Sequence, residues 1–282
     1  MIKCFQKYRI VVLTCWSGPY PWYLPYFIHS CSFNPTIDFY IITDNRNKVA
    51  DLPSNVKLIY KTLEDFNTNA SQRLGFTVCV NDPYKLNDYK PAYGYLFPEI
   101  IKGYDFWGHS DLDVVYGDIR AFLDDELLSK YDFISVRHDY TAGCFCLYRN
   151  NKKMNTFFMK SKDYKQVMEE QKHYCFDECN FAWSELREGK SILDLDTEIE
   201  SFTHVIKAAE LKKEINAHFD FILMEGHAGR LIFEDGKIIY KNQFEVILYH
   251  MVWLKEIYSP AKVFKKIPDK YYISPTRIYH HR

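Results

Sequence analysis

Two aspartates separated by one residue, Asp111 and Asp113, follow an apolar stretch in the first half of the chain. On an extended backbone, side chains two residues apart face the same side, so both carboxylates can approach one divalent cation. The same spacing recurs at Asp194 and Asp196, but that pair precedes a polar segment typical of a helix start, where acidic residues are favoured. Position therefore favours the first pair as a metal site and the second as surface charge.

Two other segments carry charges that suit a phosphate-bearing ligand. Lys85, Asp88 and Lys90 surround an expected helix start, where lysines and free backbone amides can neutralise a diphosphate. A helix cap by Asp88 with solvated lysines explains the same residues. Further along, His250 ends an apolar run and Lys255 follows it. Two carboxylates, one imidazole and the phosphates of a nucleotide would complete an octahedral Mg²⁺ or Mn²⁺ site, although a lone histidine is often only a core residue.

Apolar, β-branched runs alternate with helical stretches along most of the chain. We expect strands at residues 9–16, 37–43, 56–60, 105–110, 132–136, 143–148, 219–224, 230–233, 237–240 and 244–250. We expect helices at residues 20–32, 63–75, 89–101, 151–171, 177–188 and 197–212. Asp235-Gly236 between apolar runs predicts a hairpin. This order predicts an α/β fold with a mostly parallel, doubly wound sheet, whose ligands bind beyond the carboxyl ends of its strands.

Composition indicates an ordinary globular protein. The 282 residues are 47% hydrophobic and 26% charged with a net charge of -1, which argues against disorder and against nucleic-acid binding. A high aromatic share of 17% suits the stacking faces of sugars, although compositional drift is the favoured explanation. We find no run of about 20 apolar residues and no signal-peptide pattern, and the eight cysteines form no CxxC pair. We therefore expect a cytoplasmic protein with free thiols.

The last 24 residues differ from the rest in charge. Six basic residues stand against the single acidic Asp269, a net charge of +5: Lys262, Lys265, Lys266, Lys270, Arg277 and Arg282. We expect one domain at residues 1–258 and a basic, aromatic tail at residues 259–282. The tail suits an anionic membrane surface, while a solvated extension accounts for it equally well.

Taken in order, several of these segments resemble the GT-A glycosyltransferases, particularly bacterial polysaccharide-type and glycogenin-like members. They are a strand, the Lys-x-x-Asp-x-Lys-Pro-Ala-Tyr-Gly segment at 85–94, an apolar strand, Asp-x-Asp, and a late Tyr-His followed by Lys. The resemblance covers most of residues 8–255. It implies a Rossmann-like GT-A fold with flanking helices and a C-terminal β-hairpin region. It also implies Mn²⁺- or Mg²⁺-dependent sugar transfer from a nucleotide-diphosphate sugar, with UDP-sugar favoured, to a saccharide or lipid-linked acceptor. Surface polysaccharide synthesis, at the inner face of the membrane, would be the setting.

The resemblance also implies roles for individual residues. Asp111 and Asp113 would be the metal-binding pair, His250 the late metal ligand, and Lys255 a diphosphate contact. The other donor-binding residues would be Thr14, Cys15, Trp16, Asp44, Lys85, Asp88, Lys90, Ser110 and Leu112.

On the acceptor side, the small-residue segment with Ala142 and Gly143 would border the acceptor. Asp177 and Glu178 stand at an expected helix start, where inverting members use an acidic residue to deprotonate the acceptor hydroxyl. Capping explains Asp177 as well, and in a retaining enzyme the pair would only hold the sugar. His109 departs from the apolar residues of many relatives, so it is either structural or a contact peculiar to this branch.

Three alternative interpretations remain. In a haloacid-dehalogenase-like phosphatase, Asp111 would be the nucleophile and Asp113 the general acid, but that motif normally closes the first strand of its domain. A non-catalytic nucleotide-sugar or carbohydrate-binding module would keep the aromatic residues without needing the metal ligands. A zinc site at His173, Cys175 and Cys179 lacks a fourth ligand.

Overall fold

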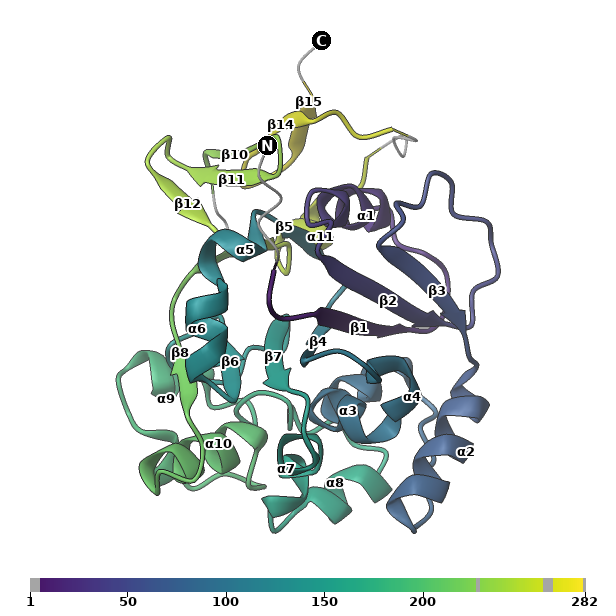
Figure 1. The fold of residues 1–282 in the computed structure, drawn as a ribbon, viewed down its shortest axis with the longest axis vertical. Coiled ribbons are helices and arrows are strands. Elements are labelled where there is room, and N and C mark those ends of the chain that lie inside the picture. Colours follow the sequence, from purple (N-terminus) through teal and green to yellow (C-terminus); the bar gives the residue numbers. More distant parts are fainter. Residues whose placement is uncertain (1–5, 227–228, 261–265, 281–282) are drawn as a thin grey trace.

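A seven-stranded mixed sheet forms the centre of the protein, whose computed structural model describes residues 6–226, 229–260 and 266–280 (Figure 1). The strands lie in the order β3-β2-β1-β4-β7-β6-β8. Their bounds are β1 (Ile10–Trp16), β2 (Ile37–Thr43), β3 (Val56–Tyr60), β4 (Phe106–Ser110), β6 (Phe133–Ser135), β7 (Phe145–Arg149) and β8 (Ala217–Phe219). Only β7 runs antiparallel to its neighbours. The expected α/β fold with a mostly parallel central sheet is confirmed.

Helices cover both faces of the parallel half of the sheet, and Figure 1 shows α1 above these strands and α3 and α4 below them. The apolar run at the start of β1 is buried because it is covered from both sides. The α-helices are α1 (Leu24–Ser32), α2 (Leu63–Leu74), α3 (Tyr93–Leu96), α4 (Pro98–Ile101), α5 (Ile119–Phe122), α6 (Asp125–Lys130), α7 (Lys152–Asn155), α8 (Tyr164–Glu169), α9 (Trp183–Arg187), α10 (Phe202–Leu211) and α11 (Leu254–Ile257). The 3-10 helices are η1 (Pro83–Ala92), η2 (Phe157–Lys160) and η3 (Ile192–Asp194).

Several expected helices are shorter or broken. The stretch 89–101 divides into the end of η1, α3 and α4, because Pro91 and Pro98 interrupt the backbone hydrogen bonds. The expected helix at 177–188 begins only at Trp183, so the placement of Asp177 at a helix start is wrong. By contrast, α2 follows its local signals, with a capping box at Thr62 and a left-handed Gly75 after its last turn.

Two smaller sheets pack beside the central one. A three-stranded sheet has the order β5 (Val114–Tyr116), β13 (Leu248–His250) and β9 (Leu223–Glu225). A five-stranded sheet has the order β12 (Phe244–Val246), β11 (Lys237–Tyr240), β10 (Leu231–Glu234), β14 (Lys270–Ile273) and β15 (Ile278–His280). The expected turn between β10 and β11 is confirmed, with Asp235 and Gly236 both at positive φ, as a type I′ turn requires.

Much of the stretch set apart as a tail is built into this five-stranded sheet. Strand β14 pairs with β10, and the buried ring of Tyr271 stacks on Phe233 with centroids 4.7 Å apart. Tyr271 also contacts Tyr26 of α1. A solvated extension is therefore the wrong description of residues 266–280. Three of the basic residues counted there lie outside the described part of the chain: Lys262, Lys265 and Arg282.

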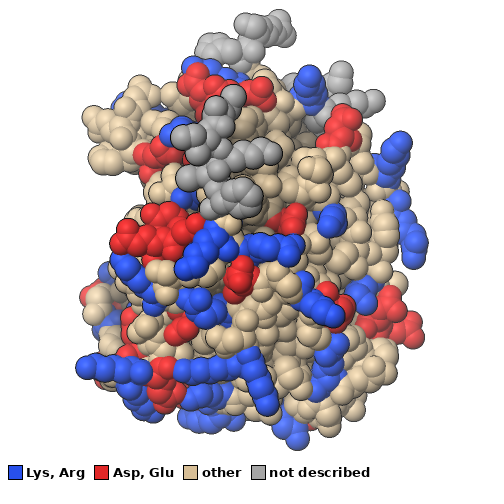
Figure 2. Space-filling model, in the orientation of Figure 1, with Lys and Arg blue, Asp and Glu red and all other residues tan. Residues whose placement is uncertain are grey.

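The surface and the thiols agree with the composition. Figure 2 shows basic and acidic side chains interspersed over the face in view. All seven cysteines within the described ranges are free thiols, as expected. Within those same ranges, no helix is both long and apolar enough to cross a membrane.

Candidate active site

The two aspartates lie in the turn that connects the central sheet to the three-stranded sheet. Asp111 follows the buried strand β4, and Asp113 immediately precedes β5. Strand β13 pairs antiparallel with β5 and sets His250 opposite Val114. One ligand atom from each of Asp111, Asp113 and His250 lies within 4.8 Å of the others. The convergence of these three residues, expected from the sequence, is therefore observed.

Cationic side chains already contact both carboxylates. Lys90 Nζ lies 2.6 Å from Asp111, and Lys255 Nζ lies 2.8 Å from Asp113. His250 Nε2 lies 3.4 Å from the same oxygen of Asp113. Burial opposes ionisation of Asp113, but His250 and Lys255 more than offset it and hold its pKa below the usual range. Burial likewise opposes charging of His250, yet Asp113 raises its pKa well above the ordinary value.

This donor set fits a hard or borderline divalent cation. Two carboxylates and one imidazole are ligands that Mn²⁺ and Mg²⁺ accept, and the ammonium groups show that this edge of the sheet stabilises positive charge. Asp194 and Asp196, which share the spacing, are not part of the group. Neither are His173, Cys175 and Cys179, and His173 instead contacts Asp88.

A carboxylate that the sequence interpretation missed supports the imidazole. Strand β9 pairs parallel with β13 and sets Glu225 opposite His250, with Glu225 Oε2 3.4 Å from His250 Nδ1. The other oxygen of Glu225 contacts the guanidinium of Arg137, which also makes two hydrogen bonds of 2.9 Å to Asp139. A carboxylate on the second ring nitrogen fixes the orientation of a histidine. No local pattern marks Glu225, because only the register of two short strands brings it to His250.

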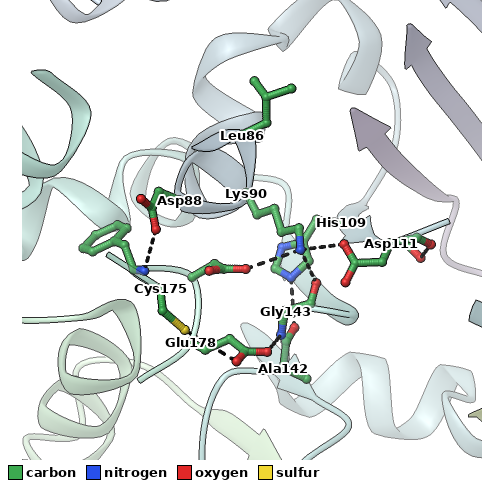
Figure 3. A network of polar contacts seen from close by, with 12 residues as sticks. Leu86, Asp88, Lys90, His109, Asp111, Ala142, Gly143, Cys175 and Glu178 are labelled. Carbon is green, nitrogen blue, oxygen red and sulfur yellow. Dashed lines mark hydrogen bonds and ion pairs between the residues drawn. The ribbon is translucent and has the colours of Figure 1, made fainter. Parts of the chain in front are cut away.

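Lys90 joins the candidate metal cluster of Asp111, Asp113 and His250 to a second acidic pair, Asp177 and Glu178 (Figure 3). Besides Asp111, its Nζ contacts Asp177 at 3.4 Å and donates to the carbonyl oxygen of Gly143 at 2.9 Å. Glu178 accepts a hydrogen bond of 2.9 Å from the N–H of Gly143. Burial raises the pKa of Asp177 to about 7, with Lys90 opposing the rise and Glu178 adding to it. Asp177 is therefore linked to the candidate metal cluster directly through Lys90, and Glu178 through Gly143 and Lys90.

The segment that carries this acidic pair has an unusual backbone. Three of its non-glycine residues have positive φ: Cys175, Asn180 and Phe181. The carboxylate of Asp88 holds the segment in place, because it accepts hydrogen bonds from the N–H groups of Tyr174 and Phe176 at 2.9 and 2.8 Å. Residues kept in such a conformation by their surroundings cluster at functional sites.

Two residues expected to bind the donor have an internal role instead. Lys85 and Asp88 are 1% and 0% exposed, and Lys85 Nζ lies 2.8 Å from Asp88. Asp88 also contacts His173 and holds the acidic segment, so neither side chain reaches a diphosphate. The segment 85–94 was predicted to bind phosphate, but its buried pair shapes the site rather than lining it.

The residues around the Asp-x-Asp pair are also internal. Ser110 is buried and its hydroxyl accepts a hydrogen bond from Tyr116, while Leu112 belongs to the core. His109 is fully buried, with Nε2 3.0 Å from the carbonyl oxygen of Ala142. Burial, with Lys90 adding to it, lowers the pKa of His109 to about 3. Of the two interpretations of His109, the structural one holds, and direct donor contacts by Ser110 and Leu112 are not supported.

The remaining donor candidates lie at the same edge of the sheet. Thr14, Cys15 and Trp16 end β1, which pairs parallel with β2 on one side and β4 on the other. Asp44 follows β2 and accepts hydrogen bonds from Gly18 N, at 2.8 Å, and from Ser17 Oγ. Asp44 thus fixes the loop after β1. Because the carboxyl ends of these parallel strands meet at one edge, these residues lie on the side where Asp111 follows β4.

Fold and site together define an α/β protein with a mostly parallel central sheet, with carboxylates and an imidazole gathered at the ligand edge of that sheet. Residues 12–282 match a family described as a family of unknown function (DUF6625), and the chain belongs to that family. No curated protein matches the chain.

Similar solved structures include three glycosyltransferases. The galactosyltransferase LgtC, in complex with donor and acceptor sugar analogs, is 12% identical, with 76% of this chain and 75% of LgtC covered at a TM-score of 0.39. Mouse xyloside xylosyltransferase 1 in its apo form is 9% identical, with 86% of this chain and 96% of the xylosyltransferase covered at a TM-score of 0.45. The glycosyltransferase GlyE from Streptococcus pneumoniae TIGR4 is 12% identical, with 76% of this chain and 45% of GlyE covered at a TM-score of 0.32. Similarity this distant carries no conclusion about activity, which rests on the geometry of the site.

Proposed function

We propose that this protein is a glycosyltransferase that binds a nucleotide-diphosphate sugar, with UDP-sugar favoured, and transfers the sugar to a hydroxyl of a saccharide or lipid-linked acceptor. The observation that carries the proposal is the convergence of Asp111, Asp113 and His250 at the ligand edge of the sheet. Two carboxylates and an imidazole there form a site for a cation that a diphosphate also binds. Lys255 adds a positive charge at the same place.

Asp111, Asp113 and His250 would hold Mn²⁺ or Mg²⁺, with Glu225 orienting the imidazole. When bound, the cation would neutralise the diphosphate and make it a better leaving group. Lys255, which here neutralises Asp113, would add charge that stabilises the departing nucleotide diphosphate.

Asp177 is the residue we assign as the general base. Its pKa of about 7 allows it to accept a proton at neutral pH. In the reaction, the acceptor oxygen forms a bond to the anomeric carbon, the bond from that carbon to the diphosphate oxygen breaks, and the hydroxyl proton passes to Asp177. Glu178 is a positioning residue, since its two oxygens accept hydrogen bonds from Gly143 N and Trp183 Nε1.

Surface polysaccharide synthesis at the cytoplasmic face of the membrane is the setting we propose. The support for a membrane setting is the basic and aromatic character of residues 259–282. Three of the basic residues, Lys266, Lys270 and Arg277, lie in the part of this segment that the structure describes. Basic residues near an anionic bilayer attract the protein to its surface.

The decisive experiment is a panel of nucleotide sugars tested for binding and hydrolysis with and without Mn²⁺. We expect at least one donor to bind and to hydrolyse slowly, and both processes to depend on the cation. Binding without any turnover would identify a carbohydrate-binding module instead. Hydrolysis of p-nitrophenyl phosphate with formation of a phosphorylated Asp111 would identify a phosphatase. If no nucleotide sugar binds in the presence of Mn²⁺, the proposal is wrong.

A further inference from the structure

Four aromatic side chains lie in sequence of contact beside the acidic pair Asp177 and Glu178, and we name Tyr84, His173, Phe181 and Trp183 the aromatic row. The ring centroids are 4.7 Å apart from Tyr84 to His173, 5.7 Å from His173 to Phe181 and 5.5 Å from Phe181 to Trp183. Each ring meets the next nearly edge to face. The row comes from two segments far apart in sequence, η1 and the segment that precedes and opens α9.

Two members of the row are exposed although they are large and aromatic. Tyr84 is 62% exposed and Phe181 is 46% exposed. Phe181 also has a φ of 64°, in the left-handed region that a residue with a bulky side chain rarely adopts. A phenylalanine held in this conformation with its ring in solvent contributes little to the core. Its placement is better explained by a ligand than by folding.

The aromatic row has the same anchor as the acidic pair. Asp88 Oδ1 lies 3.1 Å from His173 Nδ1 and 2.8 Å from the backbone nitrogen of Phe176, next to Asp177. At the other end of the row, Trp183 Nε1 donates a hydrogen bond of 2.7 Å to Glu178. One buried carboxylate and one indole therefore fix the rings relative to the acidic pair.

Tyr84 is connected to the site through His173. Its ring meets that of His173 edge to face, and His173 contacts the Asp88 carboxylate that holds the acidic segment. The row is therefore tied to the acidic segment at two points, through His173 and Asp88 at one and through Trp183 and Glu178 at the other. A molecule that presents a hydroxyl to Asp177 would extend over these rings.

We infer that the aromatic row is the acceptor subsite and that it binds the face of a sugar ring. This assignment rests on the proposed function, because it takes Asp177 as the base. A pyranose presents C–H bonds on its face and hydroxyls around its rim, and it stacks on the electron-rich face of an aromatic ring. Pockets that bind such ligands combine aromatic walls with a few polar groups.

The surroundings of the row favour a carbohydrate over an acyl chain. Lys172, which precedes His173 in sequence, forms an exposed ion pair with Glu198. The phenol of Tyr84 itself offers a donor and an acceptor. An acyl chain needs a continuous apolar surface, whereas a narrow line of rings with charged neighbours matches the mixed polarity of a sugar.

The test compares single variants of the row with a matched control. Tyr84→Ala and Phe181→Ala remove the exposed rings, while Tyr84→Phe and Phe181→Trp keep an aromatic face. Phe244→Ala, on β12, removes a ring that is 59% exposed in another sheet. The probes are an array of immobilised oligosaccharides, read without donor, and Mn²⁺-dependent hydrolysis of the nucleotide sugar without acceptor. Thermal unfolding verifies that each variant is folded.

We expect each alanine variant in the row to bind oligosaccharide roughly fivefold more weakly, the size of effect that aromatic contacts produce. Phe181→Trp and Phe244→Ala should bind normally, and Tyr84→Phe, which keeps the ring but lacks the hydroxyl, should lose less than Tyr84→Ala. Donor hydrolysis should be unchanged in all five variants. Equal binding by the row variants and the control would overturn the inference. So would a wild-type protein that hydrolyses donor but binds no oligosaccharide. Row-dependent oligosaccharide binding without any donor hydrolysis would instead contradict the proposed transferase and with it the acceptor role of the row.

Discussion

Lys255 and Asp113 form an ion pair of 2.8 Å that joins α11 to the turn between β4 and β5. The same oxygen of Asp113 faces the ring of His250. Asp113 therefore contacts both His250 and Lys255, while Lys90 pairs with Asp111. In the proposed reaction the bound cation would neutralise Asp113, and Lys255 would then neutralise the diphosphate.

The first prediction is that Asp113→Asn abolishes Mn²⁺-dependent nucleotide-sugar binding while the protein stays folded. Asparagine keeps the shape but lacks the negative charge, so the affinity for the cation should fall more than about 100-fold. Calorimetric titration with Mn²⁺ and then donor measures the effect. Asp196→Asn is the control, because Asp196 has the same spacing but lies outside the cluster. This variant should bind Mn²⁺ and donor almost as tightly as the wild type does. Full donor hydrolysis by Asp113→Asn would refute the metal assignment.

The second prediction concerns the support of His250. Glu225→Gln should raise the Mn²⁺ concentration needed for half-maximal activity by about 10- to 100-fold, because an amide holds the imidazole less firmly than a carboxylate does. The maximal rate at saturating Mn²⁺ should change less. Glu234→Gln, which disturbs only an exposed ion pair with Lys270, serves as control. An unchanged Mn²⁺ requirement in Glu225→Gln would show that the ring is fixed by packing alone.

The third prediction is a pH dependence set by Asp177. A base must be ionised, so kcat/KM should rise about tenfold per unit below pH 7 and level off above it. Lys90→Gln removes the positive charge that opposes the raised pKa, and should move the midpoint to higher pH. Asp177→Asn should lose most activity. A wild-type profile that is flat between pH 5 and 8 would argue against Asp177 as the base.

The raised pKa of Asp177 also makes the free energy of unfolding fall with increasing pH, whereas kcat/KM rises. The pKa of Asp177 rises on folding from 3.8 to about 7, so the folded state holds the proton more tightly than the unfolded chain. Stabilisation from this group is therefore complete below about pH 4 and is lost as the pH rises to about 7. Asp177→Asn should lack that decline in the free energy of unfolding, measured by urea denaturation across this range.

Sequence patterns located the residues at the ends of strands more accurately than those between elements. The apolar runs before Asp111 and around His250 predicted strands, and the position of Asp111 at the carboxyl end of β4 was predictable from the parallel sheet. His250 reaches the aspartates through a different sheet, by the antiparallel pairing of β13 with β5. Glu225 was not, because its contact depends on the register of β9 against β13. The burial of Lys85 and Asp88 was also hidden, since a Lys-x-x-Asp pattern has the same residues whether it faces solvent or the interior.

The fourth prediction tests membrane association through charge alone. Deleting residues 259–282 would remove β14 and β15 and uncover the edge of β10, so point variants are the better test. Lys266→Glu and Arg277→Glu together should weaken binding to vesicles containing phosphatidylserine, at about 1 kcal/mol for each basic residue near the surface. Lys130→Glu, on α6, serves as control. Equal sedimentation of all three proteins with vesicles would exclude this region as the membrane contact.

The last prediction is that Gly143→Ala disrupts the acidic pair without unfolding the protein. A Cβ atom at this position would lie 2.7 Å from Glu178 Oε1 and 2.8 Å from Asp177 Oδ2, closer than real Cβ contacts. Both carboxylates must then move, and Glu178 would lose its hydrogen bond from Gly143 N. A misplacement of about 1 Å at reacting groups can cost about 100-fold in rate, so transfer to acceptor should fall by that order while Mn²⁺ binding persists. Gly229→Ala is the matched control, because its Cβ would meet only a proline side chain at 3.2 Å. Normal transfer by Gly143→Ala would mean that neither carboxylate takes part in the chemistry.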